Sequence, residues 1–402
     1  MGLGLYAKGS GISAAKFFIG RGAKVLITDL KSKKELTTQI ASVMKFYEAT
    51  LSSVSPPWEG GVRGGKGGQR IKIYKPQFVL GRHRDGDFKT ADIVMKNPAV
   101  RADSSYLNLA KRHGARIETD ISLFFKLCAA PIVGITGTRG KSTTTTLVHE
   151  ILLTAGWRAY LGGNIQISPL SFADKILKND KQKTAVVLEL SSWMLESIGD
   201  AKISPPIALI TNIMPDHLNT YAGMPEYIAA KENIFRYQRA DDLAVYNYDN
   251  EITRKMGERA PAKRFWFGKR VGGSGAYLKN GLIIFRDGGE HKICSVKDIN
   301  LPGEHNAQNV MAAVALTAAM GIPPAVIKRT VKKFRGIPNR LEFIRDFRGV
   351  KFYNDTTATT PDAVIAALRA LSKGPPPLMG GVGGRVERGH FPLTSILSHK
   401  GR

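Results

Sequence analysis

Short apolar runs alternate with segments of helical period along most of the chain, and this pattern predicts an α/β protein. The apolar runs have the length of buried strands and lie at residues 23–29, 91–96, 184–190, 207–213 and 242–247. Helices are expected at 13–20, 31–50, 105–113, 227–236, about 301–320 and 361–371, and short strands with glycine turns at 264–297. Because strands that alternate with helices usually pair in parallel, we expect doubly wound sheets with helices on both faces.

The pattern is sharpest at residues 132–150, where an apolar run, a glycine turn and a helical segment follow one another. The turn reads Gly137-Thr138-Arg-Gly140-Lys141-Ser142. Glycines let backbone N–H groups approach an anion closely, and the N-terminus of the following helix favours negative charge. A lysine and a hydroxyl at these positions are typical of a phosphate loop that binds Mg²⁺. Ile135 stands where the full G-x-x-x-x-G-K-[ST] pattern has glycine, so an ordinary glycine-rich turn is the alternative.

The first 29 residues have the pattern of half a dinucleotide-type βαβ unit. A glycine turn precedes the helix at 13–20, and the strand at 23–29 ends in Asp29. The glycine spacing is not G-x-G-x-x-G, and the strand expected before Gly2 is missing from the printed sequence. Asp29 is placed to contact a ribose or uracil edge, with a plain strand-end carboxylate as the alternative. The loop at Asn97 and Pro98 also follows a strand.

Two glycine-rich stretches interrupt this pattern. One covers about residues 51–70 and the other residues 376–384, and both contain Pro-Pro-x-x-Gly-Gly-Val. The lack of hydrophobic period predicts a flexible insertion in the first case. We interpret the pair as a repeat inserted twice, and a basic nucleic-acid contact is the functional alternative.

Polar residues at strand ends mark candidate chemistry between residues 184 and 231. Glu189 interrupts an otherwise apolar strand, and a lone buried carboxylate is costly unless it has a partner. His217 follows the strand at 207–213, at the edge where α/β sheets bind ligands. Together with the phosphate loop, these two residues favour a metal site over a loop histidine without function. Lys231 is either a surface lysine or a lysine near the phosphates.

The last part of the chain supplies further candidates. Asn306 and Asn309 lie on one face near a helix N-terminus, which suits a base or ribose, or simply a cap. Residues from 339 onward begin a third unit, in which the strand at 350–354 leads into Asp355 and a threonine-rich loop. One strand and one helix cannot bury both faces of a sheet, so this unit is expected to be incomplete.

Composition narrows the class of protein. The 402 residues suggest two or three domains, and the two cysteines cannot form a disulfide framework, which favours a reducing cytosol. No apolar run is long enough to span a membrane, so we expect a cytoplasmic protein. The net charge of +26 favours an anionic partner: a nucleotide, a diphosphate-bearing substrate or nucleic acid.

Eight motifs in order resemble those of the Mur ligase family. They are the phosphate loop at 134–142, Gly-Gly-Asn-Ile (162–165), Glu-Leu-Ser-Ser-Trp-Met-Leu-Glu (189–196), Asn-Ile-Met-Pro-Asp-His-Leu (212–218), Ala-Ala-Lys (229–231), Leu-Pro-Gly-Glu-His-Asn (301–306), Asn-Arg-Leu-Glu (339–342) and Asn-Asp-Thr-Thr-Ala-Thr (354–359). The resemblance covers roughly residues 1–370, apart from the glycine-rich insertion, and is greatest to the branch that uses D-glutamate.

The resemblance implies three domains: a Rossmann-like domain for the UDP substrate at 1–130, an ATPase domain at 131–338 and an incomplete Rossmann-like domain for the amino acid at 339–402. It implies an ATP-dependent ligase of peptidoglycan precursor synthesis. This ligase would add D-glutamate to UDP-N-acetylmuramoyl-L-alanine through an acyl phosphate. The implied cofactors are ATP and Mg²⁺, and a monomer without a nucleic-acid partner is expected.

The resemblance also implies roles for individual residues. Lys141, Lys231 and His217 would be catalytic, and Lys231 matches a lysine that the family carries as a carbamate. The metal ligands would be Ser142, Glu189, His217 and Lys231. The nucleotide would contact Gly137, Thr138, Gly140, Lys141, Ser142, Thr143, Asn306, Arg340 and Asp355, and the other substrates Asp29, Asn97, Asn164, Ser191 and Thr359.

Departures from the family pattern leave three alternatives open. Ala99 replaces a usual glycine, which is expected to alter a diphosphate contact, and most of the C-terminal domain is absent. The alternatives are another Mur-type ligase, a folylpolyglutamate synthase-like ligase, and an inactive remnant that binds nucleotide only. A further alternative is a protein that binds nucleic acid through its positive charge. The sequence favours it less, because aromatic and basic residues are not interleaved along the chain.

Overall fold

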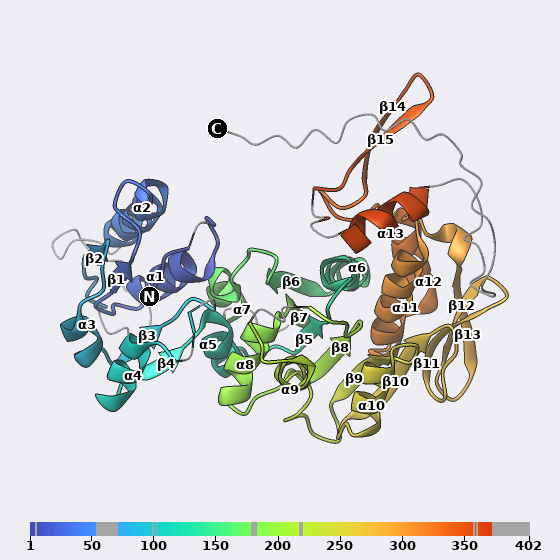
Figure 1. The fold of residues 1–402 in the computed structure, drawn as a ribbon, viewed down its shortest axis with the longest axis horizontal. Helices are drawn as coiled ribbons and strands as arrows, with labels where there is room; N and C mark the ends of the chain where they lie inside the picture. Colours follow the sequence, from blue (N-terminus) through green and yellow to red (C-terminus); the bar gives the residue numbers. More distant parts are fainter. Residues whose placement is uncertain are drawn as a thin grey trace, which may run out of the picture.

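The computed structural model describes residues 1–4, 6–53, 71–98, 100–101, 103–177, 183–216, 220–356, 358 and 361–371. These residues form an α/β fold with one nine-stranded sheet and three two-stranded sheets (Figure 1). Of the insertion predicted at about 51–70, residues 51–53 instead end a helix, and residues 54–70 lie outside the described residues. The repeat at 376–384, Ala99, His217 and Thr359 also lie outside them. Among the described residues, no helix combines the length and the apolar character that crossing a membrane demands.

The nine-stranded sheet forms the centre of the molecule, and its strand order is β13-β12-β11-β10-β9-β8-β5-β7-β6. The strands from β6 to β11 pair in parallel, and β12 and β13 add antiparallel at one edge. Their bounds are β5 Ile132–Thr136, β6 Arg158–Gly163, β7 Thr184–Glu189, β8 Ile207–Ile210, β9 Leu243–Asn247, β10 Lys263–Gly268, β11 Gly275–Lys279, β12 Leu282–Arg286 and β13 Glu290–Ser295. The parallel sheet predicted from the apolar runs is therefore confirmed.

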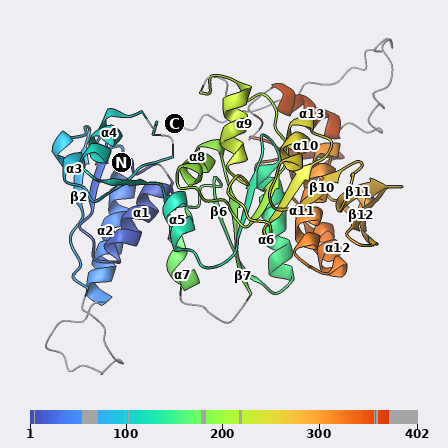
Figure 2. The same ribbon diagram turned by 90° about the horizontal axis from the view of Figure 1, so that it is seen from below.

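Helices cover both faces of this sheet, as Figure 2 shows for α9 and α10 on one face and α6 and α12 on the other. Side chains alternate between the faces, so Ala185 and Val187 join one buried cluster while Val186 and Leu188 join the other. The helices of this region are α5 Asp120–Leu127, α6 Lys141–Thr154, α7 Ala173–Leu177, α8 Ser192–Asp200, α9 Met224–Glu232, α10 Glu251–Glu258, α11 Glu304–Ala319 and α12 Pro324–Lys333, with single 3₁₀ turns at Pro169–Ser171 and Val296–Asp298.

Local sequence explains where several of these helices begin. Thr119 precedes α5, and its hydroxyl accepts from the backbone N–H of Ser122 while the Ser122 hydroxyl accepts from the backbone N–H of Thr119. This reciprocal cap satisfies two donors that the first turn leaves without partners inside the helix. Asn250 caps α10 through its side-chain oxygen, which accepts from the backbone N–H of Thr253.

The N-terminal part differs from the single doubly wound sheet that the sequence predicts. Its described residues form two separate parallel pairs, β1 Leu26–Asp29 with β2 Gln77–Leu80, and β3 Ile93–Met95 with β4 Arg116–Glu118. The helices here are α1 Ser10–Ile19, α2 Thr37–Ser53, α3 Asp85–Lys89 and α4 Ser105–Arg112. Each pair shows the predicted strand direction, and the two pairs do not share a ladder.

The C-terminal part contains a hairpin that the sequence analysis did not predict in full. β14 Glu342–Phe347 pairs antiparallel with β15 Val350–Asn354, and α13 Pro361–Leu371 follows. The strand at 350–354 is confirmed, but its partner was missed because charged and apolar residues do not alternate cleanly there. The domain boundaries expected near 130 and 338 fall between α5 and β5 and between α12 and β14, and they stay predictions.

Candidate active site at the phosphate loop

The loop between β5 and α6 leaves no room for side chains at its two glycines. Gly137 has φ +149°, and a Cβ there would stand 1.9 Å from the Thr211 hydroxyl oxygen. Gly140 has φ +81°, and a Cβ there would stand 2.1 Å from the side-chain oxygen of Asn309. The left-handed backbone and the close neighbours both exclude larger residues. The loop therefore carries no side chain at these two positions, and its exposed backbone suits the close approach of an anion.

The carboxyl end of β8 holds this loop in place. The backbone N–H of Thr138 donates to the Asn212 carbonyl over 2.8 Å, and that of Arg139 donates to the Asn212 side-chain oxygen over 2.9 Å. The Thr211 hydroxyl donates to the Arg139 carbonyl over 2.6 Å. Our sequence analysis did not single out Asn212 or Thr211, although both stand at a strand's carboxyl end, where α/β sheets carry their ligand sites.

Lys141 begins α6 and turns back onto the loop. Its ammonium donates to the Thr138 carbonyl over 3.0 Å. Burial lowers the pKa of Lys141 most, Glu189 raises it, and the charges of Arg340 and Arg139 lower it further. Two guanidinium groups thus act on the same ammonium, and this concentration of positive charge can neutralise a polyphosphate. The positive charge of these residues fits the phosphates of a nucleoside triphosphate.

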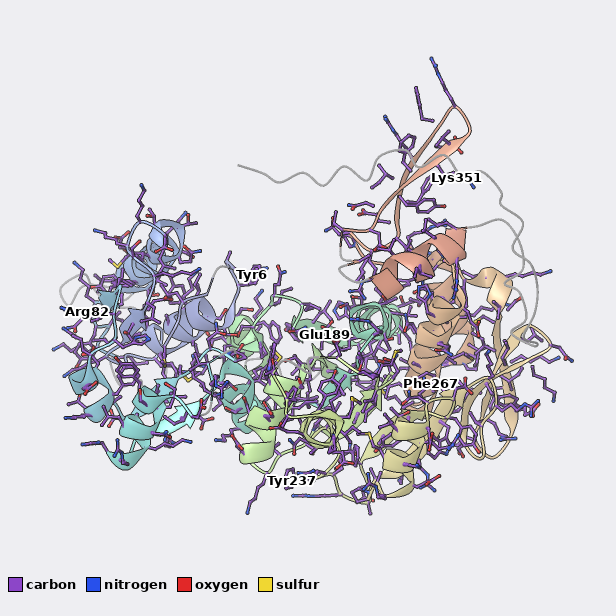
Figure 3. The ribbon with its side chains drawn as sticks, in the orientation of Figure 1. Tyr6, Arg82, Glu189, Tyr237, Phe267 and Lys351 are labelled. Carbon is purple, nitrogen blue, oxygen red and sulfur yellow. The ribbon has the colours of Figure 1, made fainter. Side chains whose placement is uncertain are left out.

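Glu189 is the last residue of β7, and one of its carboxylate oxygens has no hydrogen-bond partner. It is 2% exposed, and its Oε1 accepts from the Asn164 side-chain amide over 2.8 Å. The Oε2 atom is buried and has no hydrogen-bond partner. A buried anionic oxygen without a partner is costly, so this atom fits a cation that completes its environment. Figure 3 labels Glu189 near the middle of the molecule.

Lys231 is the most unusual charged residue near the loop, because its side chain is 2% exposed. Its ammonium donates to the Gly137 carbonyl over 3.1 Å and to the Thr136 hydroxyl over 3.4 Å, and it stands 4.8 Å from the centre of the Tyr227 ring. Burial, with a smaller contribution from the charge of Lys141, lowers the pKa of Lys231 to about 7. A large fraction of this amine is therefore neutral and nucleophilic near neutral pH.

Other residues predicted to contact nucleotide lie on elements that meet the loop. Ser142 and Thr143 form the first turn of α6, and Asn309 on α11 stands against Gly140. Asn306, one turn earlier, donates to the Pro302 carbonyl over 2.7 Å and accepts from the Asn309 amide.

Two predicted nucleotide contacts come from the segment that leads into β14 and from the end of β15. The Nε of Arg340 is buried without a hydrogen-bond partner, and its charge acts on both Lys141 and His305. The Asp355 carboxylate accepts from the backbone N–H of Leu341 over 3.3 Å. The structure thus brings the charge of Arg340 close to Lys141, whereas Asp355 contacts the segment that leads into β14 and acts on His305.

Four residues predicted to contact the other substrates are engaged within the fold. Asp29 accepts from the backbone N–H groups of Leu3 and Lys31, one on each carboxylate oxygen. Asn164 supports Glu189, and the Ser191 hydroxyl caps α8 by accepting from Met194. The backbone N–H of Asn97 donates to the Met1 carbonyl. Asp29 and Asn97 belong to the N-terminal sheets and do not join the phosphate loop.

The proposed metal ligands come from different elements. Glu189 stands at the end of β7, Ser142 in α6 and Lys231 in α9, whereas His217 lies outside the described residues. Within the part of the chain that the structure describes, no three or more His, Cys, Asp or Glu side chains gather as a metal site. Among the described residues, the predicted ligands are one buried carboxylate, one hydroxyl and one lysine, and the predicted contribution of His217 stays a prediction.

Comparison with known proteins assigns this arrangement to a family. Residues 135–317 match the family model described as the Mur ligase middle domain. A protein of Roseiflexus sp. (strain RS-1) named UDP-N-acetylmuramoylalanine–D-glutamate ligase is 40% identical over 381 residues, which are 92% of this chain and 74% of that protein. A protein of the same name from Acetivibrio thermocellus is 39% identical over 75% of this chain and 64% of its own length.

A solved structure shows the same fold at lower identity. The pseudomurein peptide ligase type C of Methanothermus fervidus is 18% identical, with a TM-score of 0.51 over 92% of this chain and 76% of its own. This likeness supports the arrangement of elements alone. The matched residues include the phosphate loop, Glu189 and Lys231, whereas Arg340 and Asp355 follow the matched region.

Proposed function

The chain belongs to the Mur ligase family of ATP-dependent ligases, and we propose that it joins D-glutamate to UDP-N-acetylmuramoyl-L-alanine in peptidoglycan precursor synthesis. The observation that carries the proposal is the pairing of a phosphate loop with the buried, half-partnered carboxylate of Glu189. The names of the two relatives at 40% and 39% identity support the choice of substrates. The anionic nucleotide substrates also suit the charge of +26.

The reaction requires activation of a carboxylate, which is a poor electrophile. In the proposed sequence, an oxygen of the substrate carboxylate attacks the γ-phosphorus of ATP, and ADP leaves. The amine of D-glutamate then attacks the acyl carbon, and phosphate leaves as the amide bond forms. Phosphoryl transfer needs positioning and neutralisation of charge more than covalent assistance from the protein.

The residues around the loop suit these demands. Backbone N–H groups and the N-terminus of α6 would face the phosphates. The Lys141 ammonium would exchange the Thr138 carbonyl, 3.0 Å away, for a phosphate oxygen. Arg340, whose buried Nε has no partner, is a second cation for the same purpose. The loop and Lys141 are held by β5, β8 and α6 before substrate arrives, so little reorganisation of these groups opposes the reaction.

Mg²⁺ would supply charge neutralisation between the phosphates and the substrate carboxylate. We propose Glu189, Ser142, His217 and Lys231 as the residues that hold it. The unpartnered Glu189 Oε2 fits this role, and carboxylates and hydroxyls are ligands that Mg²⁺ prefers. A lysine ammonium cannot bind a metal cation, so Lys231 requires a change of charge.

We expect Lys231 to react with carbon dioxide and become an anionic carbamate. The neutral amine is the reactive form, and a pKa of about 7 makes it abundant where an ordinary lysine remains protonated. The adduct forms as the amine nitrogen bonds to carbon and releases a proton. ¹³C-bicarbonate should therefore label the protein more strongly at pH 8 than at pH 6, as read by ¹³C NMR. Lys231→Arg should lose this signal, and equal labelling of Lys231→Arg and the parent chain would exclude the site.

The substrate assignment is tested by an amino-acid panel. Phosphate release is measured with ATP, Mg²⁺ and UDP-N-acetylmuramoyl-L-alanine, with D-glutamate, L-glutamate, L-alanine, L-lysine or diaminopimelate added one at a time. We expect stimulation by D-glutamate alone. Stimulation by another amino acid of the panel would reassign the chain to another Mur-type ligase. Stimulation only by a folate with L-glutamate would overturn the peptidoglycan role.

An inactive chain that binds nucleotide is distinguished in the same experiment. ATP binding is measured by calorimetry on the sample used for the panel. Binding without release in any mixture would support the nucleotide-binding remnant and contradict the ligase proposal.

A further inference from the structure

Arg139 lies between Gly137 and Gly140 of the phosphate loop, and no role was predicted for it. Its backbone is fixed by the residues that follow β8. The N–H group donates to the Asn212 side-chain oxygen over 2.9 Å. The carbonyl accepts from the Thr211 hydroxyl over 2.6 Å and from the Asn212 side-chain amide over 3.1 Å. The base of the Arg139 side chain is therefore held in place by bonds within the fold.

The bonds to Asn212 also limit what the loop backbone can offer to an anion. The N–H groups of Thr138 and Arg139 both donate to Asn212, over 2.8 and 2.9 Å. Each residue has a single backbone donor, so neither N–H can bind a phosphate while these bonds persist. In a full-length phosphate loop, backbone N–H groups surround the phosphates. Side-chain cations must therefore supply part of the neutralisation at this loop.

The side chain of Arg139 extends from the loop toward Asp216. Its Nη1 atom is 3.6 Å from Asp216 Oδ2, and the two side chains are 50% and 25% exposed. Ion pairs with this exposure contribute little to stability, because water screens the charges and the long side chain loses conformational freedom. The pair can therefore open easily, and the guanidinium can turn to an anion that carries more charge than one carboxylate.

This ion pair lies on the side of the loop where two buried lysines approach each other. Burial is the main cause of the lowered pKa values of Lys141 and Lys231, and the charge of Asp216 acts on both lysines. The charge of Arg139 acts on Lys141 as well. Under the proposed function, the terminal phosphoryl group of ATP is transferred beside these lysines. The Arg139 guanidinium is thus placed for the terminal phosphate and not for the adenosine end.

We propose that Arg139 recognises the terminal phosphate of ATP and that its guanidinium exchanges the Asp216 carboxylate for phosphate oxygens when the nucleotide binds. The nucleotide named here rests on the proposed function. A guanidinium presents its N–H donors in a planar fork that matches two oxygens of one phosphate. ADP lacks the terminal phosphate, so Arg139 returns to Asp216 once that group has been transferred. The exchange makes the chain prefer ATP and helps it to release ADP.

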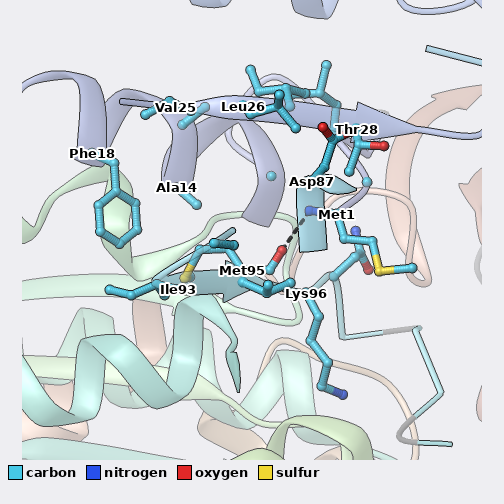
Figure 4. Close-up of a pocket in the computed structure, with 18 of the residues that line it drawn as sticks. Met1, Ala14, Phe18, Val25, Leu26, Thr28, Asp87, Ile93, Met95 and Lys96 are labelled. Carbon is cyan, nitrogen blue, oxygen red and sulfur yellow. Dashed lines mark hydrogen bonds between the residues drawn. The ribbon is translucent and has the colours of Figure 1, made fainter. Parts of the chain in front are cut away.

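A cavity in the N-terminal part suits a polyphosphate less. It has a volume of about 650 Å³ and lies between β1 and β3, and Figure 4 shows apolar side chains such as Phe18, Leu26 and Ile93 along it. Three aspartates and two lysines also line it. Apolar walls cannot satisfy phosphate oxygens, and the aspartates repel them. The cations at the phosphate loop remain the better match for the triphosphate.

Calorimetric titrations of the full chain with ATP and with ADP test the assignment. They are carried out in EDTA without Mg²⁺, so that the metal ligands do not contribute. Arg139→Gln keeps a polar side chain and removes the charge. It should weaken ATP binding by about tenfold or more and ADP binding by less than about twofold, because only ATP loses a charge-assisted bond.

Arg84→Gln is the matched control for the loss of an arginine. The Arg84 side chain is 49% exposed and pairs with Asp87 in the N-terminal part of the chain. Its exposure therefore equals that of Arg139, while its position is outside the nine-stranded sheet. This variant should bind ATP and ADP as the parent chain does.

Asp216→Asn tests the exchange itself, because it removes the anion that competes for the guanidinium. It should tighten ATP binding by about threefold or more in the parent chain and should have a smaller effect in the Arg139→Gln background, as expected for two groups that interact. Equal effects of Asp216→Asn in the two backgrounds would contradict the exchange.

Two results with Arg139→Gln would overturn the proposal. Equal losses of ATP and ADP affinity would place the guanidinium on an inner phosphate, and unchanged affinities would leave it as a surface ion pair. Binding is measured without the acceptor or an amino acid, so these outcomes are separate from those of the amino-acid panel. A chain that shows the predicted ATP preference but ligates no amino acid would support the role of Arg139 and contradict the ligase proposal. A parent chain that binds no ATP would overturn both.

Discussion

Lys141→Met is expected to reduce ligation by about a thousandfold or more, because it removes the cation that we propose to lie closest to the transferred phosphoryl group. The Lys141 ammonium is held 3.0 Å from the Thr138 carbonyl, at the N-terminus of α6, where Glu189 and Arg340 also act on it. Methionine retains most of the side-chain length and removes only the charge and the donors. Phosphate release with ATP, Mg²⁺, UDP-N-acetylmuramoyl-L-alanine and D-glutamate measures the effect.

Stability separates a functional role of Lys141 from a structural one. Burial lowers the pKa of Lys141, so the charged form is disfavoured by the fold. The variant should therefore unfold at the same temperature as the parent or higher. Lys255→Met is the matched control, since Lys255 pairs with Glu251 on an exposed helix surface and such pairs contribute little. Retention of more than about a tenth of the parent rate by Lys141→Met would contradict its assignment to the transferred phosphoryl group.

Glu189→Gln is expected to raise the Mg²⁺ concentration that activity requires and to lower turnover by about a hundredfold or more. Glutamine keeps an oxygen that can accept from Asn164 but removes the negative charge from the buried, unpartnered position of Oε2. A divalent cation would lose its anionic ligand, so half-maximal activity should require a Mg²⁺ concentration at least about tenfold higher. Initial rates measured across a Mg²⁺ titration give both quantities.

A carboxylate far from the loop controls for the general effect of removing charge. Glu150 lies in the later turns of α6, and burial raises its pKa. Glu150→Gln should leave the Mg²⁺ titration unchanged. If Glu189→Gln and the parent chain had the same Mg²⁺ requirement, the carboxylate of Glu189 would not be a metal ligand. Its role would then be structural, as the acceptor of the hydrogen bond from Asn164.

Local sequence was sufficient for the elements that carry the site. The apolar run at 132–136, the glycines at 137 and 140 and the helical segment from Lys141 specify a strand, a turn and a helix within twenty residues. The strands at 184–190, 207–213 and 242–247 were expected for the same reason and appear with ends one to three residues shorter. These predictions depend on burial and turn geometry, which neighbouring residues determine.

The sequence pattern was less informative for one strand and for one candidate site residue. The strand at 342–347 was missed, because its exposed phenylalanines and its charges do not alternate cleanly. For Asp29 the sequence left two alternatives, a contact to a ribose or uracil and a plain strand-end carboxylate. Both of its oxygens accept backbone N–H groups, and the ligand contact stays a prediction. A carboxylate at the end of a strand can bind a ligand or accept hydrogen bonds from the backbone. The path of the neighbouring glycine turn determines which backbone N–H groups lie within reach of it.

The sequence by itself determined the α/β class, the phosphate loop and the family, because these depend on residue types at short and regular spacing. Tertiary structure alone decided how the candidate site is assembled. Asn164 meets Glu189 across 25 positions, Asn212 holds the loop across 73, and Lys231 reaches Gly137 across 94. Such pairs form only when parallel strands bring their carboxyl ends to one edge, and the burial that results is what lowers the pKa of Lys231.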